Sequence, residues 1–539
     1  MSFGPQLETV KRGFPTPLKT AIKTGSRALY YAPLSKRLPP RGYRLEDYKR
    51  WFPKTGDIFL RYLKNAELPS AGSERGSGRV AVVVMPWVST AVPWYATMLG
   101  LGLAFRGREV TFIWDDTTFP DSQVEVQNRS IGNVLDFLGR YLPITRLSDH
   151  GVGELNADDG EVIDGLTDQN VSWVLRGAAP TGDDRHVVEQ IRGSLTRSLP
   201  LIRSVLDGGS ADCLVVPGGV YGTSGLFLNE AKARGCRVAT FDTDRRIAQI
   251  CVDGVAAQNG DIPMAFHSLW NADRLIRQKA VQVAMAEFHD RSANRDDYGF
   301  QVQPATKSGQ YPDGCVLIPL NVEWDTAALG RHTHFESTAD WLISTVGAVL
   351  REDAGPVVVR QHPSERRLLQ RSKLDVAALL DRTFGDDPRC QFVAADDPVS
   401  SYDLLRSARL VLPFVSTIGI EASALGKPVL ISGACYYSDL GFVWSAGSRE
   451  EYFDLLHRGV RGDLTLCPDQ AERAWLCYYL TAVRNRISTD FTPHPDDFWT
   501  WCQRPFPSLM SEPAVVDIFE AIDTGVPISL LRHARALNA

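Results

Sequence analysis

The stretch from Arg409 to Ser432, RLVLPFVSTIGIEASALGKPVLIS, predicts a strand, a loop, a helix and a second strand in immediate succession. An apolar run at 410–412 forms the first strand, and residues 418–425 form the helix, which ends at a glycine. Such an order is typical of a parallel α/β sheet. The hydroxyls of Ser416 and Thr417 stand where the helix begins, a position that suits an anion.

A second strand is predicted about fifty residues upstream, in the segment GPVVVRQHPSE. Its apolar run leads into Arg360, His362 and Pro363. A proline disfavours the helical conformation for the residue before it, so His362 is expected to be extended at the strand's end. Two interpretations of its imidazole stay open. It donates to a phosphate of a ligand, or it satisfies a backbone carbonyl.

The alternation of strands and helices occurs twice, over about residues 79–260 and again over about 314–445. This pattern predicts an α/β protein with two Rossmann-like, doubly wound domains that face a central cleft. A basic N-terminal arm and a helical C-terminal tail complete the chain. The expected divisions are an arm and linker over 1–78, a first domain over 79–310, a second domain over 311–465 and a tail over 466–539.

The composition is that of a globular protein, with 44% hydrophobic and 23% charged residues among 539. Nine cysteines without a CxxC pair favour a reducing, cytoplasmic location over a disulfide framework. Zinc ligands usually come in close pairs, so no metal site is expected.

Positive charge is concentrated at the N-terminus. Residues 1–50 hold eleven Lys and Arg against three acidic residues, a balance of +8 that leaves −14 for the remainder of a chain whose net charge is −6. An anionic membrane surface, an assembly partner and the acidic body of the protein itself are alternative contacts for this arm. Nucleic acid is not expected as a partner, because the body is acidic and carries no recognition motif.

One apolar segment has a length typical of a transmembrane helix. No charged residue occurs between Arg79 and Arg106, but Pro86 and Pro93 interrupt the run. We therefore expect a strand over 80–85 and a helix over about 94–105.

Further polar residues follow the predicted strands. Because the carboxyl ends of parallel strands meet at one edge of a sheet, these residues are candidates for the cleft. The first half contributes Asp115, Asp116, Asp242, Asp244 and a glycine-rich loop with Gly218 and Gly219, and the second half contributes Asn321, Glu323, Trp324 and Asp325.

Each of these features also has a purely structural explanation. The aspartates are either a general base for an acceptor hydroxyl or solvated turn residues. The glycine-rich loop matches neither GxGxxG nor a P-loop and is equally consistent with a tight turn. The Ser–Thr pair with Glu421 is equally consistent with a helix cap.

Taken together, RQHPSE and VSTIGIEASALGKPVLI resemble the donor domain of GT-B glycosyltransferases, and most closely the capsule polysaccharide biosynthesis group with its Kdo transferases and related CMP-sugar enzymes. The likeness is specific over about 315–445 and only architectural over 79–260. It implies that the first domain binds the acceptor and the second domain the nucleotide sugar.

Roles for individual residues follow from this resemblance. In that group the histidine of the HP motif and the hydroxyl pair bind the donor phosphate, which implies this role for His362, Ser416 and Thr417. Glu421 is expected on the ribose, with Arg360, Pro363, Gly419 and Asn321 as further donor contacts. The resemblance offers no match for the catalytic acid of that group, so Asp116 and Asp242 are candidate catalytic carboxylates only by their position after predicted strands. Gly218, Gly219, Asp115 and Trp324 are expected to contact the acceptor.

The sequence therefore predicts a glycosyltransferase without a cofactor, in which a nucleotide sugar, with CMP-sugars favoured, donates to a surface or capsular glycan. The expected location is cytoplasmic, including the inner face of the membrane. Two alternatives remain, a non-hydrolysing UDP-sugar epimerase and a catalytically silent scaffold of a polysaccharide assembly complex.

Overall fold

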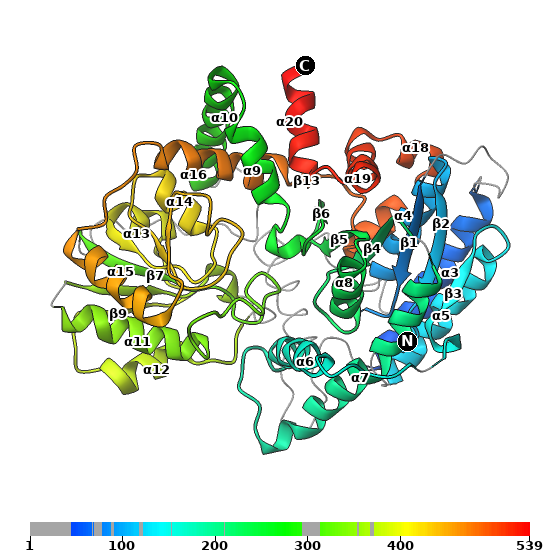
Figure 1. Cartoon of the computed structure of the whole chain (residues 1–539), viewed down its shortest axis with the longest axis horizontal. Coiled ribbons are helices and arrows are strands. Elements are labelled where there is room, and N and C mark those ends of the chain that lie inside the picture. The colour runs from blue at the N-terminus through cyan, green and yellow to red at the C-terminus, as the bar shows by residue number, and fades with distance from the viewer. Residues whose placement is uncertain are drawn as a thin grey trace, which may run out of the picture.

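A computed structural model describes residues 45–66, 68, 78–87, 91–117, 122–151, 153–209, 211–293, 313–352, 355–366 and 371–538. The basic arm over 1–44, most of the predicted linker, and Ser89 and Thr90 lie outside these ranges. The described part forms two α/β halves that lie side by side (Figure 1).

The first half is built on a seven-stranded sheet in the order β13-β6-β5-β4-β1-β2-β3. Five strands are parallel, and β6 and β13 run antiparallel at one edge. The strands are β1 (Arg79–Val84), β2 (Glu109–Trp114), β3 (Ile144–Arg146), β4 (Cys213–Pro217), β5 (Arg237–Thr243), β6 (Ile247–Val252) and β13 (Ile487–Ser488). The order of the five parallel strands reverses between β1 and β4, as in a doubly wound fold.

The charge-free segment behaves as predicted from its two prolines. It forms β1 and then α4 (Val92–Phe105), with Pro93 in the first turn of the helix. Residues 92–104 of this helix are all buried, because it lies between the sheet and the C-terminal helices. Within the described ranges, no helix is both long and apolar enough to cross a bilayer.

Other helices cover the two faces of this sheet. They are α3 (Leu45–Asn65), α5 (Ser122–Leu138), α6 (Asp159–Leu175), α7 (Arg185–Gly208) and α8 (Ser224–Ala233), with 3-10 turns η1 (Leu147–Asp149), η2 (Gly182–Asp184) and η3 (Ala256–Gln258). Helix α6 lies in a polar segment for which the sequence pattern predicted no helix. Its polar composition hides four buried apolar residues, Ile163, Leu166, Val171 and Leu175, that face the core.

The second half is built on a four-stranded parallel sheet in the order β10-β7-β8-β9. The strands are β7 (Cys315–Pro319), β8 (Val357–Arg360), β9 (Cys390–Val393) and β10 (Ala408–Val411). Helices α11 (Thr338–Arg351), α12 (Val376–Phe384), α13 (Ser401–Ser407), α14 (Ile418–Ala424) and α15 (Arg449–Arg461), with the turn η4 (Pro363–Arg366) and the short pair β11 (Leu430–Ile431) and β12 (Trp444–Ser445), complete it.

The helices that connect the two halves, α9 and α10, do not pack where the expected domain divisions put them. Helices α9 (Ile262–Trp270) and α10 (Arg274–Ser292) share a core with β7, α14 and α16 (Gln470–Tyr478), so they pack with the second half although the first domain was expected to extend to residue 310. The chain then returns. After the π-helical turn η5 (Tyr479–Arg484), strand β13 joins the first sheet.

The remaining helices form part of the first half's core rather than a separate tail. They are α17 (Pro495–Trp501), α18 (Phe506–Met510), α19 (Pro513–Thr524) and α20 (Ile528–Asn538). The predicted fold class is confirmed, with two mainly parallel α/β sheets and a helical C-terminal region.

Candidate functional site

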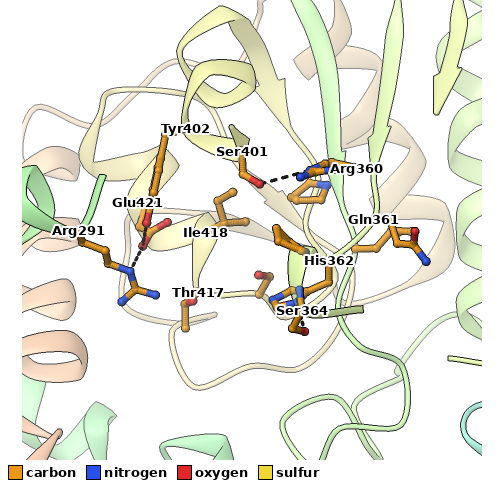
Figure 2. Close-up of a pocket in the computed structure, with 14 residues that line it drawn as sticks. Arg291, Arg360, Gln361, His362, Ser364, Ser401, Tyr402, Thr417, Ile418 and Glu421 are labelled. Atoms are coloured by element: carbon orange, nitrogen blue, oxygen red, sulfur yellow. Dashed lines mark hydrogen bonds and ion pairs between the residues drawn. The ribbon is translucent and has the colours of Figure 1, made fainter. Parts of the chain in front are cut away.

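A pocket lies at the carboxyl edge of the second sheet (Figure 2). The strand order reverses between β7 and β10, so the loops that follow these strands diverge and leave a space. This space holds about 720 Å³, open solvent included. Its lining comprises Arg291, Pro319, Leu320, Arg360, Gln361, His362, Pro363, Ser364, Ser401, Tyr402, Ser416, Thr417, Ile418 and Glu421. The two motifs found in the sequence therefore meet here.

His362 is held by Ser364 and not by a backbone carbonyl. Its Nδ1 lies 2.6 Å from the Ser364 hydroxyl and 3.2 Å from the Ser364 amide nitrogen. An amide N–H only donates, so Nδ1 is an acceptor, and the proton of the neutral ring is on Nε2. Among the described residues no backbone carbonyl binds this ring, so the Nε2–H is a candidate donor at the pocket.

The imidazole is neutral at physiological pH. Burial, together with the positive charges of Arg360 and Arg291, lowers the pKa of His362 to about 4. His362 consequently contributes a directed N–H group to this pocket, without a net charge.

Arg360 lines the pocket but directs its guanidinium elsewhere. The residue is 2% exposed, and it donates to the carbonyls of Ala394 and Val399 and, at 3.5 Å, to the Ser401 hydroxyl. These bonds tie the loop before α13 to the end of β8. That Arg360 contacts the nucleotide-sugar donor stays a prediction. Its hydrogen bonds in the structure hold this loop in place.

The Thr417 hydroxyl does not cap the helix that follows it. Thr417 stands at the N-cap position of α14, yet its side chain makes no capping hydrogen bond. Both Ser416 and Thr417 line the pocket. The backbone amides at this helix start are already engaged, because those of Gly419 and Ile420 donate to the carbonyls of Ser416 and Thr417. The hydroxyls, more than those two amides, are therefore what this helix start offers to a ligand.

Two further predicted donor contacts support the loop from behind. A Cβ on Gly419 would lie 2.5 Å from Tyr437 Oη, and that hydroxyl donates to the Ser416 carbonyl at 2.5 Å. The Asn321 Oδ1 accepts from the amide of Val415 at 3.3 Å. Neither Gly419 nor Asn321 is among the residues that line the pocket. Their contacts show them positioning the loop, and direct donor binding stays a prediction.

Glu421 is 4% exposed at the back of the pocket. Its Oε1 lies 3.5 Å from the Tyr402 hydroxyl and 3.9 Å from the Arg291 Nε. Burial raises the pKa of Glu421, whereas the charges of Arg291 and Arg486 act in the opposite direction. No contact to the start of α14 accounts for this carboxylate as a box partner, so a ligand hydroxyl remains a suitable donor to it.

In the first half, Asp115 is buried and corrects the prediction that it faces the acceptor. It is 0% exposed and accepts from the amide of Thr117 at 2.9 Å, from the Thr117 hydroxyl at 2.8 Å and from the Thr223 hydroxyl. These bonds join the end of β2 to the start of α8. Asp115 is a structural residue.

Asp116, next in the chain, is engaged as well. Its carboxylate pairs with Arg146 at 2.7 Å and accepts from the hydroxyl and amide of Ser148 at 2.7 and 3.1 Å. These contacts fix the turn after β3. A catalytic role for Asp116 stays a prediction that its contacts do not favour.

The glycine-rich loop is a tight turn packed against aromatic rings. Gly218 and Gly219 have φ values of +67° and +93°, which disfavour any other residue. A Cβ on Gly218 would lie 2.9 Å from the Trp87 ring, which in turn packs edge-on against Tyr221. Both glycines are buried, so the backbone turn itself explains them.

Trp324 connects the two halves. The Arg176 guanidinium lies 3.8 Å from the centroid of its ring. Nearby, the Thr326 hydroxyl donates to Tyr221 Oη at 2.6 Å, and the Gln258 amide donates to the Thr326 carbonyl at 2.9 Å. The loop after β7 thus rests on the first half.

Asp242 lies at the end of β5, next to this contact. Burial, together with the negative charges of Asp325 and Asp244, raises the pKa of Asp242 to about 7, although a hydrogen bond from the Thr243 amide acts in the opposite direction. A carboxyl group with this pKa suits a general base at neutral pH.

Sequence reasoning missed the residues that other segments bring to the pocket. Arg291 comes from α10 and Tyr402 from α13, neither of which carries a motif. Among the described residues, no group of three or more His, Cys, Asp or Glu side chains is arranged to hold a metal ion.

Comparison with known proteins supports the resemblance. Residues 264–453 match the family model of the capsule polysaccharide biosynthesis protein, so the similarity covers the pocket and both motifs. No curated protein sequence matches significantly.

Similar solved structures include two of Thermosulfurimonas dismutans KpsC. The beta Kdo 2,4 transferase is 14% identical, with 50% of this chain and 79% of that chain covered and a TM-score of 0.32. The beta Kdo 2,7 transferase is 15% identical, with 62% and 94% covered and a TM-score of 0.29. The UDP-N-acetylglucosamine 2-epimerase from Rickettsia bellii is 14% identical, with 75% and 94% covered and a TM-score of 0.25. At these scores the assignment of fold and site rests on the topology and the pocket.

Proposed function

We propose that the protein is a glycosyltransferase that binds a nucleotide-sugar donor in the pocket at the edge of the second sheet and transfers the sugar to a glycan. The observation that carries this proposal is the convergence of the His362 Nε2–H with the Ser416 and Thr417 hydroxyls on one space. Donors of this kind, at a topological switch point, suit the phosphate oxygens of a nucleotide.

Glu421 supplies the complementary contact. It is a buried carboxylate on the same pocket, where a ribose offers two hydroxyl donors. A buried carboxylate is costly to leave without donors, so a diol adds specificity for a nucleotide over inorganic phosphate.

The acceptor is activated by Asp242 in this proposal. An acceptor hydroxyl oxygen attacks the anomeric carbon of the donor, its proton passes to the Asp242 carboxylate, and the bond from the anomeric carbon to the phosphate oxygen breaks. The phosphate departs with the bonding electrons, and hydrogen bonds from His362 and Thr417 stabilise the charge that develops on it.

The match to the capsule polysaccharide biosynthesis model supports a surface or capsular glycan as the acceptor. A CMP-sugar as the donor is proposed from the resemblance of the sequence motifs. We further propose that the reaction takes place in the cytoplasm, including the inner face of the membrane, and that residues 1–50 contact anionic lipid or an assembly partner.

Calorimetric titration with CMP and UDP tests the site. We expect the wild type to bind one of them, and His362→Ala and Thr417→Val to weaken that binding by about 10-fold each, the equivalent of one charge-assisted hydrogen bond. His457→Ala and Thr383→Val are matched controls, because both residues belong to the same half and do not line the pocket. Unchanged affinity in both pocket variants would falsify the assignment.

Turnover separates the remaining alternatives. Release of nucleotide only when a glycan acceptor is present supports the transferase. Conversion of UDP-N-acetylglucosamine without any acceptor would instead identify an epimerase, and nucleotide binding without turnover would identify a scaffold.

A further inference from the structure

The pocket contains three basic side chains, and they have different tasks. His362 is neutral, because burial lowers its pKa to about 4. Arg360 is bound to the carbonyls of Ala394 and Val399. Arg291 is the third.

We propose that Arg291 is the cationic residue that contacts the phosphate of the bound nucleotide and neutralises the charge of the departing group. This inference rests on the proposed function of the same pocket and adds a residue from α10, outside both sequence motifs.

The packing of α10 fixes where Arg291 lies. Phe288, one turn before it, is buried with its ring edge-on to Tyr402, Trp475 and Tyr478 at centroid distances of 5.4, 5.5 and 5.8 Å. Residues three apart lie on the same side of a helix, so this packing turns Arg291 toward the second sheet. Its side chain is 12% exposed, at the edge of the pocket (Figure 2).

Arg291 and Glu421 form a wide ion pair at the pocket. Their nearest atoms, Nε and Oε1, are 3.9 Å apart, which exceeds hydrogen-bond distance. A guanidinium presents five N–H donors, and a phosphate accepts two of them side by side. Arg291 is therefore able to bind a phosphate oxygen while Glu421 stays close enough to balance its charge before the donor arrives.

His362 and Arg291 complement each other on this ligand. Figure 2 shows Arg291 and Glu421 on one side of the pocket and His362 with Ser364 on the other. A phosphate between them receives a directed N–H bond from the neutral imidazole and a full positive charge from the guanidinium. As the bond to the sugar breaks, negative charge grows on the phosphate, and the contribution of Arg291 grows with it.

The test compares CMP with cytidine, and UDP with uridine, on the full-length protein. We expect Arg291→Gln to weaken binding of the nucleotide by about 10- to 100-fold and to leave binding of the nucleoside within about 2-fold, because only the nucleotide carries the phosphate. Arg291→Lys keeps the charge and is expected to retain most of the affinity. Arg274→Gln is the matched control, an exposed arginine at the other end of the same helix.

Turnover supplies a second measurement. We expect Arg291→Gln to lower kcat as well as donor affinity, with the loss in kcat partly restored in Arg291→Lys. Thermal unfolding of each variant checks that the helix still packs.

The outcomes distinguish the two proposals. If His362→Ala and Thr417→Val weaken CMP or UDP binding while Arg291→Gln does not, the role of Arg291 is wrong and the donor site stands. An equal loss of nucleotide and nucleoside binding in a folded Arg291→Gln variant also overturns it. If the wild type binds neither nucleotide, both proposals fall.

Discussion

Asp242 at the end of β5 and Asp325 in the loop after β7 belong to different halves of the chain, yet the negative charge of Asp325 raises the pKa of Asp242. Asp325 is exposed, whereas Asp242 is half-buried. A residue of the second half thus changes the pKa of a carboxyl group in the first half, and this effect requires that the two halves lie together.

A pH profile of kcat/KM tests Asp242 as the general base. A base acts in its ionised form, so we expect the rate to fall as the pH drops through about 7, the pKa of Asp242. Asp325→Asn removes a repelling charge and is expected to move this midpoint to lower pH. Asp242→Asn is expected to lower kcat by about 10²- to 10⁴-fold. Asp386→Asn, on the surface of the second half, is the control. If Asp325→Asn leaves the midpoint of the pH profile unchanged, Asp325 does not raise the pKa of Asp242.

His362 is expected to stay neutral from pH 8 down to pH 5. Its NMR ring resonance, assigned by comparison with His362→Gln, should show no titration in this range because the pKa is about 4. An inflection near the unperturbed value of 6.5 would contradict this prediction.

The same shift has a consequence for stability. The pKa of His362 is lower in the folded than in the unfolded state, so the unfolded chain binds the proton more tightly. The site therefore costs stability as the pH falls from 6.5 toward 4, and we expect His362→Gln to flatten this part of a urea-unfolding series against pH.

Gly419 and Tyr437 should be energetically coupled. Gly419→Ala places a Cβ 2.5 Å from Tyr437 Oη and is expected to lower the free energy of unfolding by about 1–3 kcal/mol. In a Tyr437→Phe background part of this clash disappears, which predicts a coupling energy of at least about 0.5 kcal/mol in a double-mutant cycle. Gly347→Ala, where a Cβ meets only ordinary contacts, is the control; additive effects would count against this packing.

Asp115 should matter for stability and not for ligand binding. Thr223→Val removes a donor from its buried carboxylate and is expected to lower the free energy of unfolding by about 1–3 kcal/mol. CMP binding should be unchanged, since Thr223 lies in the other half. Thr383→Val on the surface should cost much less. If the Thr223→Val protein is as stable as the wild type but has altered acceptor kinetics, Asp115 acts at the acceptor site and is not a structural residue.

The local patterns in the sequence were sufficient for most elements. The strand expected over 80–85 and the helices expected over about 94–105 and over 418–425 appear as β1, α4 and α14, with bounds within two residues of those predicted. This works because a buried strand or an amphipathic helix is set by residues within one short segment. Helix α6 was missed, since its charged face conceals the few apolar residues that it buries.

The pocket was only half predictable. His362, Ser416 and Thr417 follow buried strands, and parallel strands bring their carboxyl ends to one edge whatever the rest of the chain does. Asp115 and Asp116 both follow β2. Their local sequence does not indicate that Asp115 is buried and that Asp116 pairs with Arg146.

By itself, then, the sequence determined the two α/β halves, the edge of the sheet where a ligand is expected and the motif residues on that edge. Only the tertiary structure decided that Arg291 reaches the pocket from α10, that Arg360 is bound to carbonyls and that Asp325 raises the pKa of Asp242. The reason is physical. A strand end is placed by its own segment, whereas a charge, its burial and its partners depend on segments that are brought together only when the core forms.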